Sequence, residues 1–76
     1  MQIRFSGRKV RKLRKARNLS QEELAEMSNT SERYIRDLER GEKVNPSVTV
    51  ACSISRALEL ASMEELMDVV DDESNM

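Results

Sequence analysis

The chain has 76 residues, enough for one domain, and it contains one Cys and no His. These counts exclude a disulfide framework and a His or Cys metal cluster, so no cofactor or metal is expected. No apolar run reaches the roughly 18 residues that a membrane-spanning helix needs. The first residues also lack the apolar segment of a signal peptide, so we expect a cytoplasmic protein without a membrane partner.

The net charge of −1 conceals an uneven distribution along the chain. Residues 1–40 contain 11 Lys and Arg against six Asp and Glu, a net charge of +5. Residues 41–76 contain two basic against eight acidic residues, a net charge of −6. The asymmetry is typical of a first half that faces a polyanion, although solvated charged helices would give the same counts.

The first predicted helix covers about residues 7–17. Ser6 can cap its beginning, because a serine oxygen accepts a hydrogen bond from a free backbone N–H of the first turn. Val10 and Leu13 lie three positions apart on one face, as in an amphipathic helix. Asn18 tolerates the left-handed conformation that ends many helices.

Two short helices are predicted next, over residues 21–27 and 31–40, with a polar turn between them. Ser20 and Glu23 have the spacing of a capping box at the beginning of the first of these helices. Ser31 can cap the second, and Gly41 can close it. Two capped helices joined by a short turn are typical of a helix-turn-helix.

The spacing inside this segment makes the prediction more specific. Leu24, Ile35 and Leu38 are expected to meet beneath the crossing of the two helices. Ala25 lies where a larger side chain would hold the helices apart. Asn29 falls where the turn needs a residue that tolerates a positive φ angle.

Pro46 disfavours helix at the preceding residue, which predicts a loop over residues 42–46. Ser47 can cap a further helix that reaches about Leu58. Ser62 can cap a last short helix whose apolar residues are Met63, Leu66, Met67 and Val70. No strand-like alternation is apparent, so five helices are expected. The predicted domain organisation is an N-terminal arm over 1–5, one domain over 6–70 and an acidic tail over 71–76.

About three quarters of the chain resembles the Cro/C1-type, or Xre, family of helix-turn-helix proteins. The resemblance is carried by LRKARNLSQEELAE at 13–26, YIRDLERG at 34–41 and NPSV at 45–48. It implies an all-α, compact five-helix domain of the lambda-repressor type. Three departures stand out: Asn29 replaces the usual Gly, Thr30 replaces a buried Val, and the junction over 58–63 lacks Gly and is one residue longer.

The resemblance also implies that residues 31–40 form the recognition helix in the major groove of duplex DNA. Arg33 and Arg36 lie one helical step apart, and each can bind the O6/N7 edge of guanine, which is worth about 1–3 kcal/mol of discrimination. Glu32 can accept from a cytosine amino group or can hold Arg36 in an i,i+4 pair. Plain solvated charge is the alternative for both arginines. The expected base-reading residues are Ser31, Glu32, Arg33, Arg36 and Asp37.

Phosphate contacts form a separate class, because they set the position on DNA without reading its sequence. By resemblance to the family, the expected phosphate-binding residues are Gln21, Tyr34, Arg40, Lys43 and Arg14. Arg14 and Glu39 are also expected to form a buried structural ion pair between the first helix and the recognition helix. For Cys52 a core position is favoured, and for Met63 and Met67 a core or dimer face.

The sequence thus predicts a nucleoid-associated regulator of transcription, a repressor or controller that binds a palindromic double-stranded DNA operator as a homodimer. The helices after Pro46 are the expected dimer interface. No ligand-binding domain follows, so control through concentration, a partner protein or the arrangement of DNA sites is expected. The alternative is an antitoxin or protein-interaction module with secondary DNA binding. Enzymatic activity is not expected, because no nucleophile or metal is paired with a base.

Overall fold

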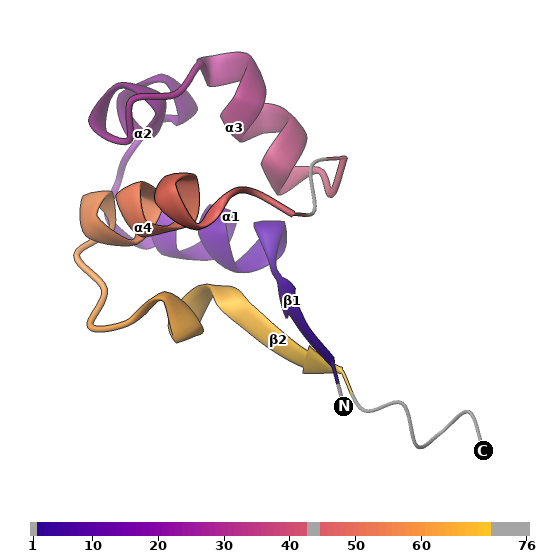
Figure 1. Ribbon diagram of the computed structural model, residues 1–76. Helices are drawn as coiled ribbons and strands as arrows, with labels where there is room; N and C mark the ends of the chain where they lie inside the picture. The colour runs from indigo at the N-terminus through magenta and orange to yellow at the C-terminus, as the bar shows by residue number, and fades with distance from the viewer. Residues whose placement is uncertain (1, 43–44, 71–76) are drawn as a thin grey trace.

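The computed structural model describes residues 2–42 and 45–70. The predicted phosphate-binding residue Lys43 and the predicted acidic tail over 71–76 lie outside the described residues. The elements in chain order are β1 (Gln2–Phe5), α1 (Gly7–Ala16), α2 (Gln21–Met27), α3 (Glu32–Glu39), α4 (Val48–Ala57), the 3-10 helix η1 (Met63–Leu66) and β2 (Met67–Val70) (Figure 1). Within the described ranges, no helix has the length and apolar character needed to cross a membrane.

Serine caps set the beginnings of the four α-helices in the described part of the chain. Each cap accepts a hydrogen bond from the backbone N–H three residues later, and the caps are Ser6, Ser20, Ser31 and Ser47. At Ser20 the predicted capping box is confirmed, because the Glu23 carboxylate also accepts from the Ser20 N–H at 2.8 Å. Local side-chain chemistry therefore fixes where the helices begin.

Within residues 2–42 and 45–70, three non-glycine residues have positive φ angles, and they end or connect helices. Asn18 (58°) and Asn29 (59°) adopt the conformation that the sequence predicts for them. Glu59 (56°) does so without a sequence signal, in the junction that lacks the family's glycine. Its N–H donates to the Arg56 carbonyl at 3.0 Å, which satisfies one of the free carbonyls at the end of α4.

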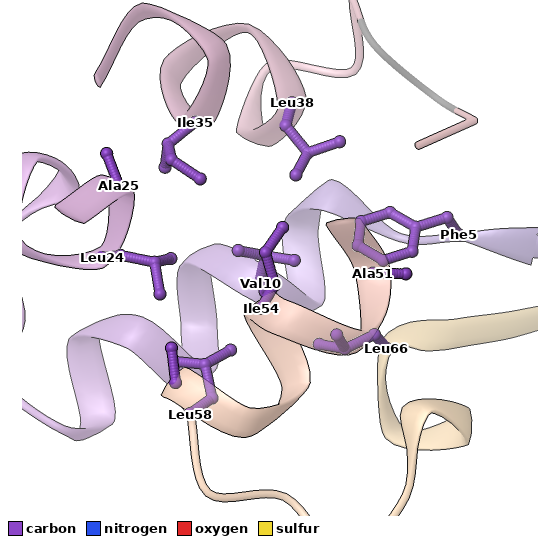
Figure 2. Packing of buried hydrophobic residues seen from close by; sticks show 11 residues of the cluster. Phe5, Val10, Leu24, Ala25, Ile35, Leu38, Ala51, Ile54, Leu58 and Leu66 are labelled. Carbon is purple, nitrogen blue, oxygen red and sulfur yellow. The ribbon is translucent and has the colours of Figure 1, made fainter. Parts of the chain in front are cut away.

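The core lies between the helices and draws on every one of them (Figure 2). Leu24, Ile35 and Leu38 are fully buried, which confirms that they meet beneath the crossing of α2 and α3. The largest fully buried side chains are Leu24, Ile35, Leu38, Ile54, Leu58, Leu66 and Val10. The core therefore fixes α3 against α1, α2 and α4.

The predicted fifth helix is not confirmed. In its place, η1 forms a single 3-10 turn, and β2 then pairs antiparallel with β1, with Phe5 opposite Met67 and Ile3 opposite Val69. The β-branched Val69 and Val70 favour strand over helix, and the residues predicted as an arm provide the partner strand. Four α-helices plus this ribbon replace the expected five helices within the described residues, and the helix-turn-helix fold stands.

Candidate nucleic-acid interface

The turn between α2 and α3 is held by a small hydrogen-bond network. The Thr30 N–H donates to the Ala25 carbonyl at 2.8 Å, and the Ser28 hydroxyl donates to the Leu24 carbonyl at 2.7 Å. The Ser28 and Thr30 hydroxyls lie 3.1 Å apart. Thr30, where the family has a buried Val, therefore has a partner for its hydroxyl. The angle between α2 and α3 is fixed by these contacts and by the buried Ala25 at their crossing.

A close backbone contact holds the C-terminal end of α3 against the beginning of α1. A Cβ atom added at Gly7 would lie 1.9 Å from the Leu38 carbonyl oxygen and 3.1 Å from the Glu39 Cα. Only a residue without a side chain lets the beginning of α1 approach the end of α3 this closely. Sequence reasoning did not single out Gly7, because a glycine at the beginning of a helix gives no sign of its tertiary neighbour.

The buried ion pair between Arg14 and Glu39 ties α1 to α3. Arg14 Nε donates to Glu39 Oε2 at 2.7 Å and Nη2 donates to Oε1 at 3.0 Å. The two side chains are 8% and 2% exposed. Arg14 Nη1 also donates to the Leu19 carbonyl at 2.7 Å. Since each guanidinium nitrogen already has an internal partner, the geometry favours the structural role of Arg14 over the phosphate contact also expected for it.

The residues expected to read bases lie together at the surface. Ser31, Glu32, Arg33 and Arg36 are exposed, and Asp37 is half-buried. The Arg33 side chain is 86% exposed, and that of Arg36 is 45% exposed. A hollow on this face is lined by Ser31, Arg33, Tyr34 and Asp37. α3 therefore presents two guanidinium groups away from the core.

Each of these arginines lies beside an acidic side chain one turn away. Arg36 Nη2 is 3.8 Å from Glu32 Oε2, the pair considered from the sequence. Arg33 Nε is 4.0 Å from Asp37 Oδ2, a pair that was not predicted from the sequence. Exposed pairs of this kind are worth about 0–1 kcal/mol. The two arginines are thus held only loosely by their acidic neighbours.

The expected phosphate-binding residues differ in their freedom to reach DNA. Gln21 is half-buried, and its Nε2 donates to Glu39 Oε1 at 3.1 Å. Tyr34 is half-buried, and desolvation by burial raises the pKa of its hydroxyl. Arg40 is exposed at the end of α3. These three residues lie on α2 and α3 or at the end of α3.

Three sulfur-containing residues had expected places in the fold: Met63, Met67 and Cys52. Met63 and Met67 are partly buried against the core, as one of the two expectations had it. Cys52 is only half-buried on α4, so the favoured core position holds in part. Within the described part of the chain, no group of three or more Cys, Asp or Glu residues could hold a metal ion.

The fold and this surface define a helix-turn-helix protein whose rigidly supported α3 presents two exposed arginines. Residues 10–66 match the model of the helix-turn-helix family. The chain therefore belongs to the Cro/C1-type helix-turn-helix family of DNA-binding transcriptional regulators.

Known relatives agree with this assignment. An immunity repressor protein of Bacillus phage phi105 is 38% identical over 52 residues, which cover 68% of this chain and 35% of that protein. The chain thus corresponds to about a third of that relative's length. The crystal structure of the restriction-modification controller protein C.AhdI from Aeromonas hydrophila is similar with a TM-score of 0.74 and 37% identity, over 79% of this chain and 88% of that one.

A second solved structure has the same arrangement. The N-terminal DNA-binding domain of the master biofilm-regulator SinR from Bacillus subtilis is similar with a TM-score of 0.73 and 30% identity. The match covers 84% of this chain and 91% of that domain.

Proposed function

We propose that this protein regulates transcription by inserting α3 into the major groove of a specific double-stranded DNA sequence. The observation that carries the proposal is the exposure of Arg33 and Arg36 on a helix whose inner face is fully buried. A bidentate arginine contact to guanine requires a guanidinium group that is free to move and a backbone that is not. The Arg14–Glu39 pair and the close contact at Gly7 provide the rigid backbone.

The proposed phosphate contacts come from the rim of the same surface. Tyr34 and Arg40 flank the base-reading face, and Gln21 begins α2 with its amide held by Glu39. Lys43 is proposed for the same role from the sequence resemblance alone. Such contacts fix the protein on the duplex, and they make the affinity fall as salt rises.

The proposed DNA site is a palindrome read by two copies of the chain. One recognition helix makes few base contacts, so two half-sites about 34 Å apart supply the affinity and specificity of most such modules. The relatives named as an immunity repressor and as a controller protein favour a repressor or controller role here as well. The segment after Pro46, with its acidic excess, is the proposed source of the dimer contact because acidic groups avoid phosphates.

Selection of bound duplexes from a random library tests this function. The expected result is a palindromic consensus whose half-site contains guanines, with an affinity that decreases steeply between about 50 and 200 mM salt. Tight binding to a co-encoded protein with no sequence preference on DNA would favour the antitoxin alternative and contradict the proposal.

A further inference from the structure

The outward face of α3 carries no net charge, although it is the face proposed to meet DNA. Arg33 lies 4.0 Å from an Asp37 oxygen, and Arg36 lies 3.8 Å from a Glu32 oxygen. The two positive and two negative charges of this face cancel. Because a duplex attracts a protein through Lys and Arg groups that can replace its counterions, the attraction depends on basic groups beyond this face. Arg40, exposed at the end of α3, is one of them.

Helix α1 is the most basic element in the described part of the chain. Six of its ten residues are Lys or Arg, and none is acidic. Three of the six have an acidic neighbour: Lys9 Nζ lies 2.9 Å from Asp68 Oδ1, and Arg14 is held by Glu39. The hydrogen bond from Lys9 and, more weakly, the charge of Arg8 lower the pKa of the Asp68 carboxyl, so Arg8 also faces an acidic group.

The other three basic residues of α1 have uncompensated charges. They are Arg11, Lys12 and Lys15, which are all exposed and form no ion pair within residues 2–42 and 45–70. Lys12 lines a hollow together with Leu13 and Glu65 on the side of α1 that faces η1. A positive charge on the side toward α3 therefore has to come from the remaining two residues.

Arg11 lies on the side of α1 that contacts α3. Residues three and four positions apart are neighbours on a helix surface. Arg11 follows Gly7 by four positions and precedes Arg14 by three, and both of these residues contact the C-terminal end of α3. Lys15 follows Arg11 by four positions and continues the same row. The basic surface that begins with Arg40 thus extends across the contact between the two helices onto α1.

We propose that Arg11 and Lys15 bind phosphates of the duplex just outside the base pairs that α3 reads. The N-terminal part of a recognition helix points at base edges, so its C-terminal end, where α1 crosses it, lies nearer the sugar-phosphate rim. Two exposed cations without an acidic partner complement the phosphates there. This inference rests on the proposed function, because it takes α3 to be the helix in the groove. The two residues add affinity without reading sequence.

Salt titration of binding to the selected duplex, with three single variants, tests the proposal. Arg11→Gln and Lys15→Gln remove the charge but keep an unbranched side chain with good helix propensity. Lys12→Gln is the matched control, because it removes one charge from the η1 side of the same helix. We expect Arg11→Gln and Lys15→Gln each to reduce the slope of log affinity against log salt by about 0.9, the value for one phosphate, and Lys12→Gln to leave it unchanged.

Duplex length provides a second measurement. The proposed phosphates lie beyond the base pairs that α3 protects, so they are absent from a duplex that ends at the outermost protected pair. On that short duplex, wild type and Arg11→Gln should bind equally. On a duplex extended by half a helical turn at each end, wild type should bind severalfold more tightly than Arg11→Gln.

Three outcomes overturn the proposal. A salt slope that Arg11→Gln and Lys15→Gln both leave unchanged removes the contact. An equal decrease with Lys12→Gln would show a general effect of net charge. A loss of affinity that does not depend on duplex length would place the contact inside the base-reading segment. None of these outcomes contradicts the proposed function, which fails if variants of Arg33 and Arg36 leave the sequence preference unchanged.

Discussion

Arg14 and Glu39, which are 25 positions apart in the sequence, meet in a bidentate ion pair that is almost closed off from solvent. The pair joins the helix that begins the domain to the helix proposed to read DNA. Gln21 adds a third contact, since its amide donates to the same carboxylate. The buried Glu39 carboxylate thus fixes the positions of α1, α2 and α3 relative to one another.

Removing one partner of this pair should be strongly destabilising. Glu39→Gln keeps the shape of the side chain but leaves the Arg14 charge buried without its counter-charge, and we expect a loss of about 3–5 kcal/mol in the free energy of unfolding. The double variant Arg14→Met/Glu39→Leu should lose less than the single variant, because no buried charge is left behind. Urea denaturation followed by circular dichroism measures both. A loss below about 1 kcal/mol for Glu39→Gln would show that the pair is unimportant for stability.

Gly7→Ala should displace α3. The added methyl group overlaps the Leu38 carbonyl oxygen, which is backbone and cannot rotate away. We expect a decrease of about 1–3 kcal/mol in stability, the usual cost of overpacking, together with weaker DNA binding at temperatures where the variant is still folded. Arg8→Ala is the matched control, because Arg8 is exposed on the same turn of α1. Equal stability of the two variants would contradict the role given to Gly7.

The sequence predicts most of the helical structure because its signals are local. Serine caps and apolar residues at helical spacing place α1 to α4 within a residue or two, and Asn18 and Asn29 mark turns through their tolerance of positive φ. The ribbon was not predicted because its signal is not local. Residues 2–5 and 67–70 become strands only through pairing with each other, and each is too short to reveal an alternating pattern.

The features of the candidate site could likewise be predicted where they depend on local sequence, and not where they depend on contacts across the fold. Helical periodicity and the family resemblance identify which residues of α3 point outward. The Glu32–Arg36 pair, one of the two roles considered for Glu32, is present. The Arg33–Asp37 pair depends on rotamers, which the sequence does not reveal. Gly7 depends on a backbone contact across the fold. The contacts with DNA themselves stay predictions.

Glu59→Gly should be more stable than Glu59→Ala by about 1 kcal/mol, because only glycine adopts the left-handed conformation at this helix end without steric cost. Glu59 has φ of 56° and an exposed ion pair with Arg17 at 3.2 Å. Both variants lack that ion pair, so their difference isolates the backbone. Thermal unfolding of the two proteins measures it. Equal melting temperatures would mean that the junction relaxes when the side chain is removed.

Attachment of the ribbon should weaken at low pH through Asp68. The hydrogen bond from Lys9, aided by the Lys9 charge and by Ser6 and Arg8, lowers the pKa of the Asp68 carboxyl. Because the folded pKa lies below the unfolded value, the stabilisation is complete above the ordinary aspartate pKa of about 4. It then disappears as the pH falls through the lowered pKa.

Asp68→Asn provides the control for this pH dependence. The stability difference between wild type and Asp68→Asn should be constant from pH 7 to about 5 and should shrink at lower pH, where the wild-type carboxyl also becomes neutral. Chemical denaturation at a series of pH values measures it. A difference that stays the same down to about pH 2, below the ordinary aspartate range, would show that Asp68 is not held by Lys9 in solution.

Arg33→Ala and Arg36→Ala should each relax sequence preference at one or two base pairs and leave the fold unchanged, because both side chains point away from the core. Removing a bidentate guanine contact takes away about 1–3 kcal/mol of discrimination. Arg40→Ala is the comparison. Without the guanidinium proposed to contact a phosphate, the protein should bind all sequences more weakly by about the same factor, with a salt dependence reduced by about one released counterion. Competition gel shifts with single-base variants of the selected site measure both effects. If neither arginine variant changes the preference at any position, α3 is not the helix that reads the bases.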